Sequence, residues 1–309
     1  MRVFAASIAA LAAGAASAAA QGNVTSCASG LYLLVARGTT EPPGPGISGD
    51  LADNIAEEIK GSEVVSLDYP ATLFDPDYKD SVALGARGMH DEVEEYAKLC
   101  PRSKIAIIGY SQGAQLTMDA FCGVGDASFG NTTRLPSDMV KKNVVAIVLF
   151  GDPTHVANTT YDKGTSIRDG IFTRDDATVK VCEGYSDRLV SYCDTGDTYC
   201  DAGRNRTVHV SYIYRYGDEV RKFVVDRYNK ATNAGNNSTT TSRPSPTATG
   251  FTTVEPSASA SSGSSSTSSS SPTSTSSAGS KSSAASISFA GNSAYLALSL
   301  AIAAAFQVL

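Results

Sequence analysis

The chain has 309 residues, with 31 acidic and 25 basic side chains and a formal net charge of −6 at pH 7. This negative balance disfavours a nucleic-acid partner. Hydrophobic residues make up 42% of the chain, which is enough for a sizeable core.

The first 20 residues have a short basic start, an alanine-rich apolar run and an A-x-A site. This pattern is typical of a secretory signal peptide, and the alternative is an N-terminal membrane anchor. The run is weakly hydrophobic and ends in small residues, which favours the signal peptide. We therefore expect the folded domain to begin at Gln21.

Residues 21–232 alternate between strand-like and helix-like segments. Continuous apolar runs, typical of strands covered on both faces, predict strands at 31–38, 63–70, 104–110 and 143–151, with a fifth at 188–193. Helical patterns are expected over 82–100, 111–122 and 218–228. This alternation predicts an α/β fold, a three-layer α/β/α sandwich around a mainly parallel sheet. In such sheets, ligands and catalytic groups gather beyond the carboxyl ends of the strands.

The cysteines indicate disulfides, because there are six of them and all lie in this domain. In a secreted chain, an even number favours three disulfides over a metal site or free thiols, so no metal or other cofactor is expected. The residues alone leave the pairing open among Cys27, Cys100, Cys122, Cys182, Cys193 and Cys200. N-glycosylation sequons fit the same compartment and lie at Asn23, Asn131, Asn158, Asn205, Asn236 and Asn237.

The run GYSQG at 109–113 is a G-x-S-x-G motif at a predicted strand-to-helix junction. There a serine occupies a strained turn that projects its Oγ over the sheet edge, and the glycines avoid collisions with neighbouring backbone. The N–H of Gln112 and the start of the helix would face a developing oxyanion. The motif at this junction predicts Ser111 as a nucleophile, and the alternative is an ordinary glycine-flanked turn.

A serine nucleophile needs a base, usually histidine, and the chain contains three. His90 lies within a predicted helix beside acidic residues, as expected of a solvated surface residue. His155 follows a predicted strand and could reach the active edge. His209 lies beyond Ser111 and beyond an acidic loop, in the serine–acid–histidine order of α/β-hydrolases, so it is the predicted base.

The acidic loop is the segment YCDTGDTYC at 192–200, which places two aspartates between closely spaced cysteines. Asp194 directly follows Cys193, where it could cap the turn or face solvent. Asp197 follows Gly196 at the far bend. Because so short a disulfide loop gains little from chain entropy, we interpret it as fixing the loop that presents a carboxylate to His209.

The C-terminal part of the chain changes composition sharply. Residues 233–286 are mostly Ser and Thr with few large apolar residues, which predicts a disordered, O-glycosylated stalk. Residues 287–309 form an uncharged apolar tail that matches a GPI-anchor signal, and the alternative is a C-terminal transmembrane helix. The expected product is a secreted monomer, GPI-anchored at the cell surface or in the wall.

The motifs GYSQG, YCDTGDTYC and HVSY, with VARGTTE and DYPA earlier in the chain, resemble the fungal cutinase and acetylxylan esterase family of carbohydrate esterases. The resemblance implies a small α/β-hydrolase with a five-stranded, mostly parallel sheet and no metal. It implies Asp197 as the catalytic acid, and Thr39 with Gln112 as the oxyanion hole; the other reading of Thr39 is a polar residue that ends the first strand. It also implies the disulfides Cys27–Cys100, Cys122–Cys182 and Cys193–Cys200.

The segment between Asp197 and His209 bears on the substrate. It is polar, with Asp201, Arg204, Arg206 and the Asn205 sequon, whereas a cutinase must hold long acyl chains. Together with the third cysteine pair, it favours a serine esterase that removes acetyl groups from xylan or related wall polysaccharide. The alternative is hydrolysis of cutin or other polyesters. An alternative of a different class is a catalytically inactive, GPI-anchored wall or adhesion protein.

Overall fold

A computed structural model of the protein describes residues 26–237, and the side chains of residues 26–233. The predicted signal peptide, nearly all of the predicted stalk, the apolar tail and the sequon at Asn23 lie outside the described residues. The same holds for the side chains of Asn236 and Asn237.

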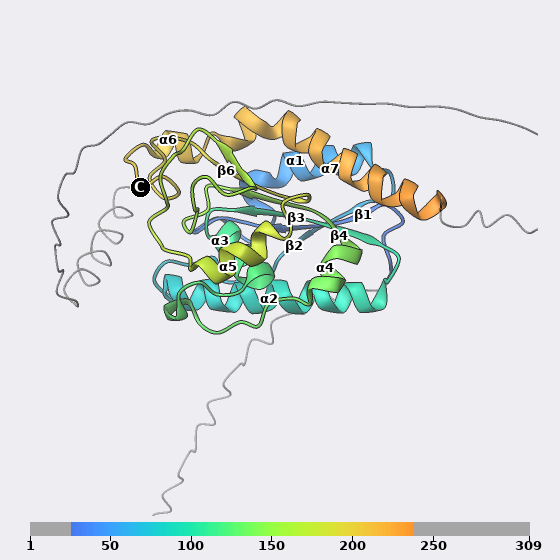
Figure 1. The fold of residues 1–309 in the computed structure, drawn as a ribbon, viewed down its shortest axis with the longest axis horizontal. Coiled ribbons are helices and arrows are strands. Elements are labelled where there is room, and N and C mark those ends of the chain that lie inside the picture. The colour runs from blue at the N-terminus through green and yellow to red at the C-terminus, as the bar shows by residue number, and fades with distance from the viewer. Residues whose placement is uncertain (1–25, 238–309) are drawn as a thin grey trace, which may run out of the picture. The chain divides into compact units, whose positions relative to one another are not determined.

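A single sheet of parallel strands forms the centre of the domain (Figure 1). The six strands are β1 (Leu31–Ala36), β2 (Glu63–Ser66), β3 (Lys104–Tyr110), β4 (Val144–Phe150), β5 (Asp162–Gly164) and β6 (Leu189–Cys193). Their order is β2-β1-β3-β4-β6-β5, and every neighbouring pair is parallel. β1, β3 and β4 are buried along almost their whole length, as their continuous apolar runs predict.

The predicted strand count of five is wrong by one strand. The additional strand, β5, has only three residues, DKG, and they are exposed or half-buried. It pairs with β6 through backbone hydrogen bonds at the sheet edge. Such a strand needs no apolar side chains, so the hydrophobic pattern contains no sign of it.

Helices cover both faces of the sheet and complete three layers (Figure 1). One face carries α1 (Gly49–Glu58) and α7 (Tyr212–Asn237). The other face carries α2 (Tyr78–Leu99), α3 (Gln112–Cys122), α4 (Ser137–Asn143) and α5 (Asp176–Glu183). The short helix α6 (Arg206–His209) precedes α7, and two 3-10 turns lie at Gly46–Ser48 and Ala127–Phe129. α7 continues past Thr232, where the sequence predicts the domain to end.

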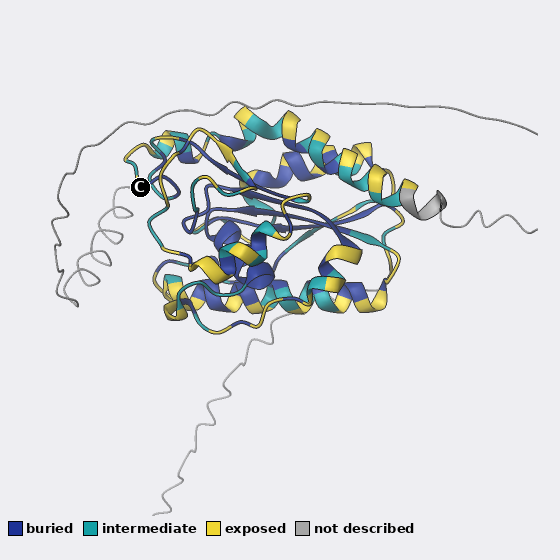
Figure 2. Cartoon of the chain, in the orientation of Figure 1, coloured by how far each residue is buried: buried dark blue, intermediate teal, exposed yellow. Residues whose placement is uncertain are grey.

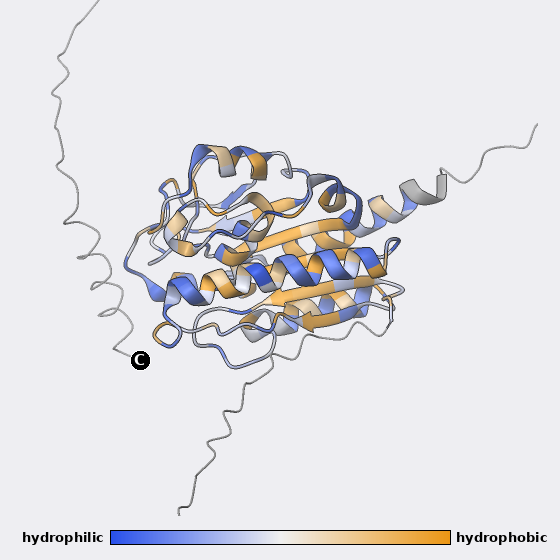
Figure 3. Ribbon diagram, turned by 90° about the horizontal axis from the view of Figure 1, so that it is seen from below, coloured by the Kyte–Doolittle hydropathy of each residue, from blue (hydrophilic) through white to orange (hydrophobic). Residues whose placement is uncertain are grey.

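Two apolar cores lie on the two sides of the sheet, and they contain the largest buried side chains. Figure 2 shows the strands buried between exposed outer helix faces, and Figure 3 shows the same strands as the most apolar part of the domain. α3 is buried along its whole length beneath α2 and α5. Among residues 26–237, no helix is both long and apolar enough to cross a membrane.

The structure contains three disulfides, in the pairing that the family resemblance implies. They are Cys27–Cys100, Cys122–Cys182 and Cys193–Cys200. The first two close loops of 73 and 60 residues, and the third closes a loop of 7. Loop-closure entropy assigns roughly 4 kcal/mol to each long loop and roughly 2 kcal/mol to the short one. The short disulfide therefore contributes the least to stability through the unfolded chain.

Candidate active site

Ser111 lies on the turn between β3 and α3, at the carboxyl edge of the sheet. Its backbone has a positive φ, with φ 55° and ψ −118°, a conformation that residues with a side chain rarely adopt. A Cβ on Gly109 would lie 2.6 Å from the Gly113 carbonyl oxygen, and a Cβ on Gly113 would lie 2.1 Å from the Ala36 carbonyl oxygen. The two glycines thus let the first turn of α3 pack directly against β3 and β1, which is the steric requirement of a nucleophile turn.

A chain of hydrogen bonds joins Ser111, His209 and Asp197. The His209 Nε2 lies 3.0 Å from the Ser111 Oγ, and the His209 Nδ1 lies 2.9 Å from one Asp197 carboxylate oxygen and 3.1 Å from the other. An ionised carboxylate only accepts hydrogen bonds, so Nδ1 carries the proton and Nε2 is left to accept from the serine hydroxyl. Ser111 and His209 are nearly buried, at 9% and 6% exposed, and Asp197 is fully buried.

The Asp197 carboxylate is surrounded by donors. Besides His209, it accepts hydrogen bonds from the Tyr212 hydroxyl at 2.7 Å and from the backbone N–H of Tyr199 and Cys200 at 2.7 and 3.1 Å. Burial acts to raise the pKa of Asp197, but the bonds from His209, Tyr212 and Tyr199 hold that pKa below its usual range. Burial also raises the pKa of Tyr212, which therefore keeps the proton that it donates.

Asp194, the other aspartate of the loop, faces a different set of partners. Its carboxylate forms an ion pair with Arg215 and accepts hydrogen bonds from Thr165 and from the Tyr216 hydroxyl at 2.7 Å. The side chain is 1% exposed, so it does not face solvent, and its carboxylate binds these partners rather than His209. Of the two aspartates, only Asp197 lies against the histidine.

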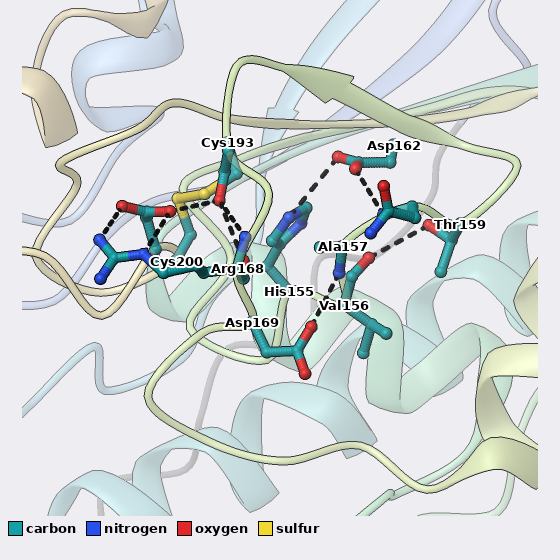
Figure 4. Close-up of polar contacts among 12 residues, drawn as sticks. His155, Val156, Ala157, Thr159, Asp162, Arg168, Asp169, Cys193 and Cys200 are labelled. Carbon is teal, nitrogen blue, oxygen red and sulfur yellow. Dashed lines mark hydrogen bonds and ion pairs between the residues drawn. A yellow bond between two sulfur atoms is a disulfide. The ribbon is translucent and has the colours of Figure 1, made fainter. Parts of the chain in front are cut away.

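The other two histidines lie apart from this hydrogen-bonded chain. His155 is buried on the turn after β4, and its Nε2 faces Asp162 at 3.6 Å, as Figure 4 shows. His90 is half-buried on α2, where its Nδ1 contacts the neighbouring Asp91 carboxylate at 3.0 Å. The structure brings only His209 into contact with Ser111.

The loop that contains Asp197 is held by more than its disulfide. Asp201 is fully buried, and its carboxylate accepts hydrogen bonds from the Gly196 N–H at 2.7 Å, from the Ser166 hydroxyl and from the Arg168 guanidinium. Figure 4 shows Arg168 near the Cys193–Cys200 bridge. Asp201 was expected among the polar residues that border the site; it instead ties the loop to the 166–168 turn.

The two residues predicted for the oxyanion hole lie on adjacent turns. Gln112 is the first residue of α3, where helix geometry leaves the backbone N–H without an intrahelical acceptor. Its side chain accepts from the Ser81 hydroxyl at 2.8 Å and donates to the Thr72 carbonyl at 3.0 Å. Thr39 is half-buried on the turn after β1, whose end contacts Gly113. Both turns therefore lie at the edge that presents Ser111.

Sequence reasoning missed three residues that position His209. Gly151, after β4, has φ 61°, and a Cβ there would lie 2.7 Å from the His209 Cε1. The Tyr110 hydroxyl donates to the His209 carbonyl at 3.0 Å, and Tyr212 donates to Asp197. The GDP run at 151–153 was visible in the sequence, but its contact with a histidine far along the chain was not.

Gly151→Ala is expected to lower kcat for ester hydrolysis by roughly 100-fold, because a displacement of His209 by about 1 Å breaks the alignment that proton transfer needs. Steady-state rates on nitrophenyl acetate measure the effect. Gly123→Ala, at the C-terminal end of α3, is the matched control, since Gly123 also has a positive φ, 100°, but the nearest atom to the added Cβ is the Thr178 Cγ2 at 3.4 Å. Equal rates for the two variants would contradict the predicted role of Gly151.

A buried serine, histidine and carboxylate in one hydrogen-bonded chain, at the carboxyl edge of a parallel sheet, define a serine hydrolase of the α/β class. Within residues 26–233, no group of three or more His, Cys, Asp or Glu side chains is arranged to hold a metal ion.

Comparison with known proteins identifies the family. The family model described as Cutinase matches residues 27–228, so the chain belongs to the cutinase family and is a serine carboxylic ester hydrolase. Acetylxylan esterase 2 of Talaromyces purpureogenus is 32% identical over 63% of this chain and 85% of its own length. Cutinase 11 of Verticillium dahliae is 33% identical over 66% of this chain and 70% of its own length. The solved catalytic core of an acetylxylan esterase from Trichoderma reesei is 28% identical, and the match covers 64% of this chain and 98% of that one, with a TM-score of 0.58.

Proposed function

We propose that Ser111 is the nucleophile, His209 the general base and Asp197 the acid that orients the histidine. The observation that carries this assignment is the 3.0 Å contact between the Ser111 Oγ and the His209 Nε2, with Nδ1 held by a buried carboxylate. The backbone N–H groups of Thr39 and Gln112 are proposed to form the oxyanion hole.

The reaction follows from this geometry. Ser111 Oγ attacks the ester carbonyl while its proton moves to His209 Nε2, and the carbonyl oxygen becomes an oxyanion. The C–O bond to the alcohol then breaks, and His209 returns the proton to the leaving alcohol. Water attacks the acyl-enzyme by the same route, giving the carboxylic acid and free Ser111. Asp197 stabilises the imidazolium that forms in each half of the reaction.

The proposed substrate is an acetylated xylan or related wall polysaccharide, from which the enzyme removes acetyl groups. The exposed residues of the 197–209 segment support this, because Arg204 and the sequon residue Asn205 place charge and a predicted glycan beside Asp197. Such a border suits a polar polymer better than a lipid. Two of the similar proteins reported above are acetylxylan esterases.

A second candidate substrate is a polyester such as cutin. Two exposed apolar side chains near the site favour it: Val210 directly follows His209 and is 55% exposed, and Phe74 is 67% exposed on the loop whose Thr72 carbonyl binds Gln112. An apolar surface of this kind could contact a water-insoluble polymer.

Two measurements on the same preparation separate these substrates. They are kcat/KM for nitrophenyl esters of increasing acyl length, and acetate release from acetylated xylan. The proposal expects the highest kcat/KM for acetate esters, with acetate released from xylan. A preference for long acyl chains without acetate release would select the polyester. Failure of Ser111 to label with an active-site organophosphate would instead favour an inactive wall or adhesion protein.

Location and processing are also proposals. We infer a monomer secreted through the predicted signal peptide at residues 1–20 and held at the cell surface or wall by a GPI anchor added near the C-terminus. Three sequons with described side chains, at Asn131, Asn158 and Asn205, are exposed, as glycosylation requires. Mass spectrometry of glycopeptides and release by a phosphatidylinositol-specific phospholipase test these inferences.

A further inference from the structure

The loop after β1, residues 37–47, which we call the Thr39 loop, has an unusual backbone. Thr40 lies in the left-handed region with φ 65°, and so does Ala71 on the neighbouring loop after β2, with φ 53°. The Thr40 N–H donates to the Ala71 carbonyl at 2.7 Å, so the two strained residues meet. Non-glycine residues stay in this region only where surrounding contacts hold them, and such strain clusters at functional sites.

Arg37 is one source of that restraint. Its side chain is 4% exposed, and its guanidinium donates hydrogen bonds to carbonyls of both loops. The acceptors are the carbonyls of Glu41 at 3.0 Å, Leu67 at 3.3 Å, Tyr69 at 2.6 Å and Pro70 at 3.3 Å. The Tyr69 hydroxyl donates in return to the Arg37 carbonyl at 2.6 Å. Arg37 therefore ties the Thr39 loop to the loop after β2.

The Glu41 carboxylate is the second source. One oxygen accepts from the Gly38 N–H at 2.5 Å, and the other accepts from the Ile47 N–H at 2.7 Å. A Cβ on Gly46, which has φ 59°, would lie 2.3 Å from this carboxylate. The Thr39 loop thus folds around one side chain, with N–H groups on both sides of Thr39 bound to it.

We propose that Arg37 and Glu41 are positioning residues that aim the backbone N–H of Thr39 at the oxyanion; this rests on the proposed function. An oxyanion donor stabilises the transition state only if it is oriented before the reaction begins. Between the end of β1 at Ala36 and the 3-10 turn that begins at Gly46, the loop contains no helix or strand. Its start is held against α3 by the contact of Gly113 with Ala36. Beyond that contact, the Arg37 and Glu41 hydrogen bonds direct the chain past Thr39.

Glu41→Gln tests the proposal, because the amide keeps the shape of the carboxylate but presents an NH2 group to one of the two N–H donors. We expect kcat for nitrophenyl acetate to fall by roughly 10- to 100-fold, less than the loss of a whole oxyanion donor, with KM changed by less than about threefold. Glu57→Gln, at an exposed position of α1, is the matched control and should match the wild type. Unchanged kcat in Glu41→Gln would overturn the proposal.

A second readout distinguishes positioning from general structural support. A thionoester develops negative charge on sulfur, which accepts hydrogen bonds weakly, so an intact oxyanion hole favours the oxygen ester. Glu41→Gln should lower kcat/KM for the oxygen ester more than for the thionoester, and Arg37→Lys should do the same. An equal fall in kcat/KM for both substrates in both variants would overturn the proposal. If Glu41→Gln does not fold, the same comparison in Arg37→Lys tests the proposal.

Failure of this inference and failure of the proposed function give different results. If Ser111→Ala retains turnover, the assignment of the nucleophile is wrong and the positioning proposal falls with it. If Ser111→Ala is inactive while Glu41→Gln keeps the wild-type ratio of ester to thionoester rates, only the positioning proposal is overturned.

Discussion

Ser111→Ala is expected to lower kcat for ester hydrolysis by about 10⁴-fold or more, because removal of a triad nucleophile leaves only binding and oxyanion stabilisation. Folding should be little affected, since the change removes only one hydroxyl, which is nearly buried and contacts the His209 Nε2. Rates on nitrophenyl acetate, combined with thermal unfolding, measure both expectations.

Loss of organophosphate labelling provides an independent check on this variant. The phosphorus reagent bonds to the nucleophile itself, so wild-type protein should gain the adduct mass at Ser111 and Ser111→Ala should gain none. Near-normal turnover or continued labelling of another serine would show that the nucleophile lies elsewhere.

Asp197→Asn is expected to lower kcat by roughly 10⁴-fold, because the amide no longer holds the His209 tautomer with the proton on Nδ1. The contacts of Asp197 explain the sensitivity: Nδ1 lies 2.9 Å from the carboxylate, and Tyr212 donates to the same oxygen at 2.7 Å. Nuclear magnetic resonance of the ring protons and steady-state kinetics together report the tautomer and the rate.

Asp194→Asn is a matched control within the same disulfide loop. It removes the ion pair with Arg215, whose side chain is 40% exposed, and weakens the bond from Tyr216. We expect a lower unfolding temperature with kcat within a few-fold of the wild type. A loss of kcat as large as that of Asp197→Asn would mean that catalysis depends on both aspartates of the loop, and not on Asp197 in particular.

The pH dependence of stability should distinguish the wild type from Asp197→Asn. Burial opposes ionisation of Asp197, but bonds from His209 and Tyr212 hold its pKa below the usual value. A lowered pKa stabilises the folded protein above the unfolded pKa of about 4, and this stabilisation disappears as pH falls through the folded pKa. The difference in unfolding free energy between the wild type and Asp197→Asn should therefore be largest above pH ~5 and shrink toward acid.

The positions of the main strands along the chain were predictable because burial on two faces requires continuous apolar runs. β2 is the exception: it is a half-buried edge strand, and it ends at Ser66 rather than at residue 70. β3 has the predicted bounds, and β1, β4 and β6 differ by a residue or two at their ends. The final helix, expected over 218–228, begins at Tyr212, where the apolar spacing at every fourth residue already starts with Tyr212, Tyr216, Val220 and Val224. It ends at Asn237, after mostly polar residues that carry no apolar pattern. α1, α4 and α5 were not predicted; they are short and have narrow apolar faces.

By itself, the sequence determined the α/β architecture, the serine turn and the order of serine, acid and histidine, because strand burial and turn sterics act over a few neighbouring residues. The family resemblance implied Asp197 over Asp194, but only the tertiary structure gives the physical reason, since Arg215 and Thr165 bind the Asp194 carboxylate from outside the loop. It also decided that Gly151 makes room for the imidazole and that Glu41 is the centre of the Thr39 loop. These roles depend on partners that only folding brings together, so no local pattern records them.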